Sequence, residues 1–269
     1  MAAINHRPIF IGGMNKSGTT LFRAMLGQHP HIFSGLETHW FSPEIMQQWK
    51  STRSQRMQWL REFYEVTQAD LDTLAAASES GPAFIDRFLV LATRRASKRR
   101  WAEKTPRNIE HIEEIFGHWP DAQFIHVVRD PRDIYVSRRR AKNLSLDQFL
   151  EDMRTILLPA GHYFGTRSGR YIEVRYEDLV QEPRATMSIV LKFLEEPWDE
   201  AVAKFGGAPE ELEKVRSLTG RPSTTLQSLS EPLHADAIGT WLSQLQKEEL
   251  VAIAHELAPI YSKFGYHLT

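Results

Sequence analysis

The fold of this chain is set near its start by residues 8–23, PIFIGGMNKSGTTLFR. The apolar run Ile9 to Ile11 is too short for a helix and is typical of a parallel strand that is covered on both faces. Gly13 and Gly18 bound the turn that follows, because glycine adopts backbone angles and tolerates close approaches that other residues resist. Apolar positions 21, 22, 25 and 26 then predict one face of a helix. The stretch is therefore predicted to form a strand, a turn and a helix.

A turn of this kind between a strand and a helix predicts an anion site. The N–H groups at the start of a helix point outward, and the helix dipole favours a negative charge by about 0.3–1 kcal/mol. Gly13 and Gly18 are five residues apart, as in a Walker A loop, but that loop requires a lysine where this chain has Thr19. We therefore expect a phosphate cradle rather than ordinary ATP or GTP hydrolysis; the alternative is a tight structural turn with an exposed lysine. The candidate cradle comprises Lys16, Ser17, Gly18, Thr19 and Thr20.

The composition is ordinary for a soluble globular protein, with 42% hydrophobic and 25% charged residues in a chain of 269. This length can bury the core of a single large domain, residues 1–269. A formal net charge of −1 argues against a general nucleic-acid binder. The absence of cysteine excludes disulfides, thiolate catalysis and cysteine-ligated zinc. No apolar run reaches transmembrane length and the N-terminus has no signal-peptide apolar region, so we expect a cytoplasmic protein without a membrane span.

Two further strand ends carry side chains suited to chemistry. The apolar run at 32–34 leads into a loop with Glu37, and the run at 100–104 ends on Lys104. Loops after parallel strands open at the carboxyl edge of a sheet, where ligands bind in open α/β folds, so we expect Glu37 near Lys16. The simpler alternatives are an exposed or ion-paired loop glutamate and a solvated surface lysine.

The second informative stretch is 124–137, which begins with a predicted buried strand. Arg129 stands at the carboxyl end of that strand, and Ser137 lies eight residues later, about two turns along the next helix. An arginine can bind a phosphate through two parallel hydrogen bonds, and a serine hydroxyl can donate to another oxygen. We therefore expect a second phosphate site at Arg129 and Ser137. The basic residues that follow are expected to form a solvated face: Arg138, Arg139, Arg140 and Lys142.

Five strand candidates alternate with helices, which predicts an α/β domain with a central parallel sheet and helices on both faces. Residues 41–98 add a helical insertion that is expected to be scaffold and to shape an acceptor site. Asn108 is predicted to cap a helix over 109–116. Residues 205–237 are predicted to be mainly loop around one short helix, and Arg221, Ser223 and Thr224 within it could fold over a ligand. Two phosphate sites at two strand ends indicate one ligand with two separated phosphates.

These residues resemble the two cofactor motifs of the sulfotransferases, enzymes that use 3′-phosphoadenosine 5′-phosphosulfate (PAPS). The first motif is matched by KSGTTL at 16–21, and the second by Arg129 and Ser137 around VVRDPRD. The resemblance implies a P-loop-like three-layer α/β fold, in which the first motif holds the 5′-phosphosulfate and Arg129 and Ser137 hold the 3′-phosphate. It covers most of the chain and is weakest in the helical insertion. Its further matches are VRYEDLV at 174–180, Ser223 and Thr224.

Within that family the chain is most similar to the tyrosylprotein and carbohydrate sulfotransferases, through RAML at 23–26, GLET at 35–38 and AIGTW at 237–241. This similarity implies that Glu37 is the catalytic base and that a sulfonate contact is made by Lys104. It also implies that the adenine is contacted by Tyr176. His39, two residues after Glu37, is a second candidate base.

The chain also departs from each branch of the family. The tyrosylprotein enzymes have arginine at the position of Lys16, whereas the cytosolic small-molecule enzymes have lysine. The cytosolic enzymes have a histidine base shortly after a Lys-Thr pair, but here Lys104 and Thr105 are followed by Pro106. The tyrosylprotein enzymes are Golgi membrane proteins, so a soluble, bacterial-type relative is the simplest interpretation.

The function implied is an in-line transfer of the sulfuryl group from PAPS, without a metal, to an acceptor hydroxyl on a small molecule, a sugar or a peptide tyrosine. Lys16 and Lys104 would stabilise charge in the transition state. Two other functions stay open. A P-loop kinase for a small metabolite would need magnesium and a lysine after Gly18. A non-catalytic nucleotide-binding protein would have kept only the fold. The sequence is compatible with a homodimer.

Overall fold

A five-stranded sheet forms the centre of the computed structural model, which describes residues 3–166, 168–219, 229 and 232–268. The strands follow the order β2-β3-β1-β4-β5, and every neighbouring pair is parallel. This arrangement confirms the predicted α/β fold and its central parallel sheet. The strands are β1 Ile9–Gly13, β2 Ile32–Ser34, β3 Arg100–Lys104, β4 Gln123–Val128 and β5 Tyr171–Arg175.

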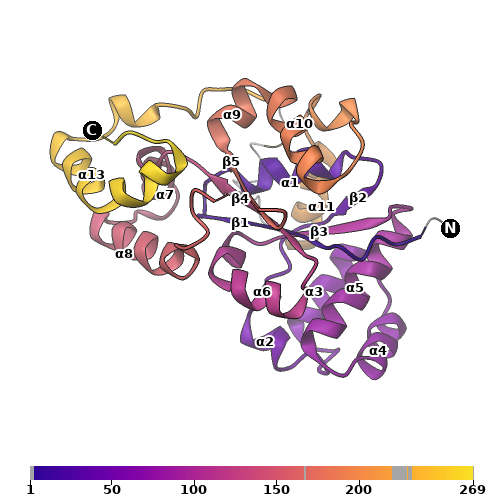
Figure 1. Ribbon diagram of the computed structural model, residues 1–269. Helices are drawn as coiled ribbons and strands as arrows, with labels where there is room; N and C mark the ends of the chain where they lie inside the picture. Colours follow the sequence, from indigo (N-terminus) through magenta and orange to yellow (C-terminus); the bar gives the residue numbers. More distant parts are fainter. Residues whose placement is uncertain (1–2, 167, 220–228, 230–231, 269) are drawn as a thin grey trace.

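Helices cover both faces of the sheet. In chain order they are α1 Thr19–Gly27, α2 Pro43–Met46, α3 Gln55–Tyr64, α4 Gln68–Ala77, α5 Gly81–Arg95, η1 Pro106–His111, α6 Ile112–His118, α7 Pro131–Lys142, α8 Leu146–Leu157, η2 Leu158–Ala160, α9 Tyr176–Gln181, α10 Pro183–Leu194, η3 Glu200–Val202, α11 Pro209–Thr219, η4 Thr240–Ser243, α13 Lys247–Tyr261 and η5 Ser262–Phe264. In Figure 1, α1, α9 and α10 lie on one side of the sheet, and α5 and α6 lie on the other. Near the C-terminus, α13 packs on α7 and α8.

The register of the central strands brings the candidate site residues to one edge of the sheet. All five residues of β1 are buried, as expected for a strand that is covered on both faces. Ile11 of β1 lies opposite Lys104 of β3 and Ile125 of β4. The carboxyl ends of these three strands therefore open together, and they lead into the 14–18 loop, η1 and Arg129.

The helical insertion packs its aromatic side chains into the core. Trp40 makes edge-on contacts with Phe84 and Phe88, and Tyr64 makes one with Phe88. These rings are nearly or fully buried, as the prediction of a scaffold required. The Tyr64 hydroxyl also donates to the Leu36 carbonyl at 2.7 Å. The insertion thus braces the loop that carries Glu37.

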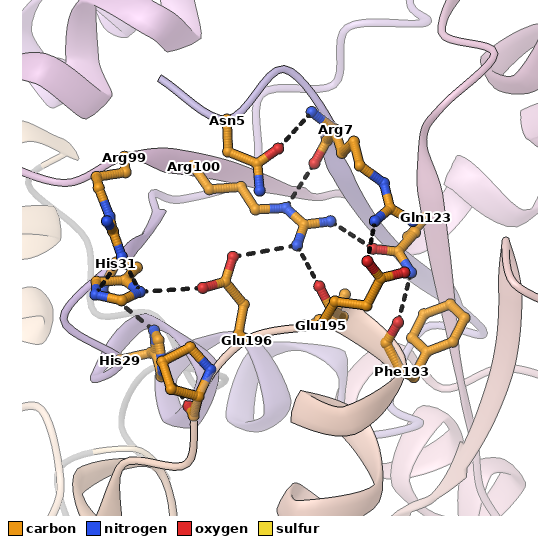
Figure 2. A network of polar contacts seen from close by, with 12 residues as sticks. Asn5, Arg7, His29, His31, Arg99, Arg100, Gln123, Phe193, Glu195 and Glu196 are labelled. Atoms are coloured by element: carbon orange, nitrogen blue, oxygen red, sulfur yellow. Dashed lines mark hydrogen bonds and ion pairs between the residues drawn. The ribbon is translucent and has the colours of Figure 1, made fainter. Parts of the chain in front are cut away.

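A buried polar network ties the amino ends of the strands together, opposite the candidate site (Figure 2). Arg100, which is fully buried at the start of β3, donates to the Arg7 carbonyl, the Leu194 carbonyl and the Gln123 side chain at 2.6–2.7 Å. It also pairs with Glu196 at 3.3 Å. One arginine therefore joins the segment before β1, the start of β4 and the end of α10.

The same network contains His29, His31 and Glu196. Their side-chain nitrogen and oxygen atoms, which are of the kinds that bind metal ions, lie within 4.8 Å of one another. His29 uses both ring nitrogens, one on the Pro197 carbonyl and one on the His31 N–H. Arg99 places its guanidinium 2.5–2.6 Å from both ring nitrogens of His31. These hydrogen bonds give the cluster a structural role, and its positive charge is supplied by Arg99.

The predicted role of Asn108 is wrong. The segment after β3 is a 3₁₀ helix, η1, followed by α6, which begins after His111 without a side-chain cap. The Asn108 side chain instead donates to the Ile11 carbonyl and to Glu103 at 3.1 and 2.6 Å. The side chain is buried, so tertiary partners outweigh its local preference for a helix start.

Candidate active site

The candidate cradle has the backbone geometry that its glycines predicted. Gly18 precedes α1 with φ 97°, and a Cβ there would lie 2.4 Å from Cδ2 of Tyr176. Gly13 has φ 151°, and a Cβ there would lie 2.3 Å from the Val127 carbonyl oxygen. Lys16 also has a left-handed backbone, with φ 75°. The cradle therefore needs glycine at both positions to bring the loop against β4 and α9.

A cavity of about 860 Å³ opens at this edge of the sheet. Among the described residues, its lining comes from 15–39, 106–142, 176 and 229–240, and none comes from the insertion at 41–98. The cavity brings most of the predicted site residues together. Those that line it are Lys16, Gly18, Thr19, Thr20, Glu37, Arg129, Ser137 and Tyr176.

Two of the remaining predicted residues, Ser17 and Lys104, do not line the cavity. Ser17 is fully buried, and its hydroxyl has no hydrogen-bond partner among the described residues. Lys104 is only 1% exposed and lies directly behind Thr20 and Glu37. Ser223 and Thr224 fall outside the residues that the structure describes, as does Arg221.

A chain of polar contacts runs from the cradle to the loop after β2. Lys104 Nζ donates to Thr20 Oγ1 at 3.0 Å and to Glu37 Oε1 at 2.5 Å. The other carboxylate oxygen of Glu37, Oε2, lies 3.2 Å from Nε2 of His39. The sequence placed Glu37 and Lys16 near each other, and they do line the same cavity. The direct partners of Glu37, however, are Lys104 and His39.

The charged groups in this series of polar contacts shift one another's pKa values. Burial would raise the pKa of Glu37, but the charge of Lys104 and hydrogen bonds from His39 and Lys104 hold it well below its usual range. Burial lowers the pKa of Lys104, and the Glu37 carboxylate offsets part of that effect. Burial also lowers the pKa of Lys16, with further lowering from the charges of Lys142 and Arg129. An anion bound in the cavity would therefore stabilise the charged forms of these lysines.

Glu103 is the residue that sequence reasoning missed most clearly. Its buried Oε1 accepts from the Thr38 N–H, the Thr38 hydroxyl and the Thr105 hydroxyl at 3.3, 2.5 and 2.8 Å. Its Oε2 accepts from Asn108 at 2.6 Å. Thr105 Oγ1 in turn accepts from the His39 N–H at 3.1 Å. Glu103 thus fixes the backbone that follows Glu37, directly at Thr38 and through Thr105 at His39. The available signal was a carboxylate in an otherwise strand-like run.

The insertion supports the same loop from its other side. Arg56 of α3 donates to the carbonyl oxygens of Glu37 and Thr38. Together with the Tyr64 contact to Leu36, these bonds hold three successive carbonyl groups. The loop is therefore fixed by side chains from β3 and α3 and by Thr105, which lies between β3 and η1.

Arg129 is held at the end of β4 by the cradle itself. Its Nη1 donates to the Lys16 carbonyl at 2.9 Å, and its Nη2 donates to the Ala237 carbonyl at 2.5 Å. The guanidinium also lies over the Tyr176 ring, 4.5 Å from its centroid. Its buried Nε has no partner among the described residues. Ser137 stands two turns further along α7, partly exposed to the cavity.

Asp133 was a second omission. This buried carboxylate of α7 accepts from the Gly239 N–H, the Thr240 hydroxyl and the Trp241 N–H at 2.8, 2.6 and 3.1 Å. It thereby anchors the 237–241 segment beside Arg129. The charged run RDPRD gave no way to tell which of its members face inward.

The expectation that Arg138–Lys142 form a solvated face is only partly correct. Arg138 is buried and pairs with Asp152 of α8, and Arg139 pairs with Glu249 of α13 at 2.9 Å. These partners are available because α7 packs on α13 and contacts α8 through the rings of Tyr135 and Phe149. Arg140 and Lys142 are exposed, and they line the cavity.

Comparison with known proteins agrees with this geometry. Residues 8–200 match the model of the sulfotransferase family. The chain belongs to that family. The match includes the cradle, the Glu37 loop, Lys104 and the Arg129–Ser137 pair. A kinase-type Walker lysine is not present at Thr19, where α1 begins.

Among its relatives in this family are two animal enzymes named protein-tyrosine sulfotransferase. The Drosophila melanogaster protein is 28% identical over 96% of this chain and 51% of its own length. The Caenorhabditis elegans protein, form A, is 29% identical over 96% of this chain and 67% of its own length. The chain thus spans about half to two thirds of the length of these relatives.

Solved structures also share the fold. The sulfotransferase domain of the Synechococcus PCC 7002 olefin synthase aligns with a TM-score of 0.71 at 21% identity, covering 100% of this chain and 98% of that domain. None of the helices in the described part of the chain has the length and apolarity to cross a membrane.

Proposed function

We propose that this chain transfers the sulfuryl group of PAPS to an acceptor hydroxyl. The observation that carries the proposal is the shared cavity, in which the cradle, the Arg129–Ser137 pair and the Glu37 loop meet. A nucleoside triphosphate needs only the first of these anion sites, whereas a nucleotide with a 3′-phosphate and a 5′-phosphosulfate needs both. Membership of the sulfotransferase family supports the same ligand.

The residues present fit such a ligand. The Ser17 hydroxyl and Arg129 Nε are buried polar atoms without partners among the described residues, and buried polar atoms are normally satisfied. Gly18, which has no side chain, lets the Tyr176 ring approach the backbone at the start of α1. We assign the 5′-phosphosulfate to Lys16 and the residue 17–20 amides, the 3′-phosphate to Arg129 and Ser137, and the adenine to Tyr176.

The chemistry is in-line displacement, in which positioning and charge neutralisation dominate, as in phosphoryl transfer. Lys16 and the N–H groups at the start of α1 stabilise the charge that develops on the leaving phosphate oxygen. Lys104, held between Thr20 and Glu37, stabilises the sulfonyl oxygens from behind the cradle. The proton of the acceptor hydroxyl is taken at the Glu37–His39 pair on the cavity wall.

We place the acceptor on the side of the cavity that carries the Glu37–His39 pair, where Pro106 also lines the wall. We propose a hydroxyl acceptor, and the names of the animal relatives support peptide tyrosine as one of its forms. The insertion at 41–98 shapes this side indirectly, because Arg56 and Tyr64 hold the Glu37 loop.

Calorimetry with 3′,5′-ADP and 5′-AMP tests the two-phosphate assignment. Arg129→Ala is expected to weaken 3′,5′-ADP binding by roughly 10- to 100-fold, which corresponds to losing a charge-assisted hydrogen bond of about 1.5–3 kcal/mol. The affinity for 5′-AMP should fall less. Arg107→Ala is the control, because Arg107 is exposed and its ion-pair partner among the described residues is Glu110. Equal losses for both nucleotides in Arg129→Ala would contradict the assignment.

A further inference from the structure

We propose that His39 accepts the proton of the acceptor hydroxyl and that Glu37 is its positioning residue, an assignment that rests on the proposed sulfuryl transfer. The two side chains form a pair, with His39 Nε2 lying 3.2 Å from Glu37 Oε2. Both line the cavity. The His39 side chain is 49% exposed, whereas that of Glu37 is 32% exposed. The imidazole is therefore the more accessible of the two side chains on the cavity wall.

The contacts of Glu37 make it a poor proton acceptor. Its Oε1 receives the Lys104 ammonium at 2.5 Å, and its Oε2 faces His39. Lys104 is held in this position by Thr20 and is itself almost fully buried. An ammonium beside a carboxylate stabilises the ionised form, and the pKa of Glu37 is accordingly held well below its usual range. A carboxylate so stabilised gives little driving force for proton abstraction.

The loop is built to fix His39. Its backbone is left-handed, with φ 52°, an uncommon conformation for a residue other than glycine. The His39 N–H donates to Thr105 Oγ1 at 3.1 Å, and the Thr105 hydroxyl donates to Glu103 at 2.8 Å. Such a conformation persists where surrounding contacts over-determine it, and it commonly occurs at functional sites. Here the contacts direct the imidazole to Glu37 and the cavity.

The pairing sets which nitrogen does which task. Nε2 carries its proton toward Glu37, so Nδ1 is the nitrogen with the lone pair. As the acceptor oxygen bonds to sulfur, the bond from sulfur to the 5′-phosphate oxygen breaks, and Nδ1 takes the hydroxyl proton. The imidazolium that forms is stabilised by the Glu37 carboxylate, the arrangement used by carboxylate–histidine pairs in hydrolases. The products are a sulfate ester, 3′,5′-ADP and a proton that later leaves to solvent.

The charged groups around the pair come from three other elements. Lys104 of β3 contacts Glu37, Lys16 of the cradle interacts with Glu37, and Arg56 of α3 donates to the loop carbonyls. All three are cations, so they favour an ionised Glu37 before the reaction. This is the protonation state that the proposed transfer requires.

The test is the pH dependence of kcat/KM for PAPS and a phenolic acceptor, tyramine, in wild type, His39→Gln, Glu37→Gln and His255→Gln. His255 is an exposed control histidine outside the cavity. His39→Gln should lose about 10²–10⁴-fold in kcat and keep its affinity for 3′,5′-ADP. The acid limb of the wild-type profile, expected between about pH 5 and 8 where histidines change charge, should disappear. In His39→Ala, added imidazole should restore turnover, which a merely structural loss would not permit.

Glu37→Gln should lose less than His39→Gln and keep the acid limb. The assignment to His39 would be overturned if Glu37→Gln lost more activity than His39→Gln and His39→Gln stayed near wild-type activity. It would also be overturned if imidazole did not rescue His39→Ala. Either result would leave sulfuryl transfer standing. Wild-type protein that binds 3′,5′-ADP but releases none from PAPS with tyramine, sugar or peptide acceptors would overturn sulfuryl transfer, and the role of His39 with it.

Discussion

Gly18→Ala is the substitution whose effect the structure specifies best. Gly18 ends the cradle with φ 97°, and its missing Cβ would lie 2.4 Å from the Tyr176 ring. That ring is buried, and the guanidinium of Arg129 lies against it. The ring therefore cannot move aside without disturbing the residue that we assign to the 3′-phosphate.

The expected cost has two parts. A left-handed backbone costs a residue with a Cβ about 1–2 kcal/mol, and overpacking a buried site costs about 1–3 kcal/mol more. We therefore expect Gly18→Ala to lower the free energy of unfolding by roughly 2–5 kcal/mol. Because the added methyl group also displaces the loop, affinity for 3′,5′-ADP should fall at least about tenfold.

Urea denaturation and calorimetry with 3′,5′-ADP measure the two effects. Gly117→Ala is the matched control, since Gly117 lies inside α6 with nothing within 4 Å of its added Cβ. That control should stabilise the protein by up to about 1 kcal/mol, the difference in helix propensity, and leave binding unchanged. Wild-type stability and affinity in Gly18→Ala would refute the geometric account of the cradle.

Two more predictions concern the polar groups beneath the cavity. Glu103→Ala should cost about 3–5 kcal/mol in the free energy of unfolding and should lower kcat, because it leaves four buried donor contacts without their acceptor; a thermal or urea melt within about 0.5 kcal/mol of wild type would contradict this. Glu37 has a pKa that is lower in the folded than in the unfolded protein, so its ionised form stabilises the fold above the ordinary value of 4.5, and that contribution is lost as the pH falls below it. Stability measured from pH 7 to pH 3 should therefore fall less in Glu37→Gln than in wild type, and parallel curves would contradict the Lys104–Glu37 pairing.

The fold and the cradle were predictable because their signals are local. Short apolar runs, two glycines at fixed spacing and a basic residue at a strand end each depend on a few neighbouring residues. The errors and omissions share another cause. Asn108 bonds to Ile11 and Glu103, and Arg138 pairs with Asp152, so their roles depend on residues that only the folded chain brings near.

The same reason explains why Glu103 and Asp133 were missed. Each is a buried carboxylate whose partners lie mostly far away in the sequence, at Thr38 or at 239–241. Tertiary packing decides whether such a residue faces solvent or the interior. A charged residue within a buried strand or a mainly buried helix is the one available sign, and it does not name the partners.

The central claim is tested most directly by incubating the protein with PAPS labelled on sulfur and a phenolic acceptor. The account predicts that one 3′,5′-ADP forms for each labelled sulfate ester, and that Lys16→Ala and Lys104→Met reduce both products together. Transfer of a phosphoryl group from ATP with no turnover of PAPS would contradict it.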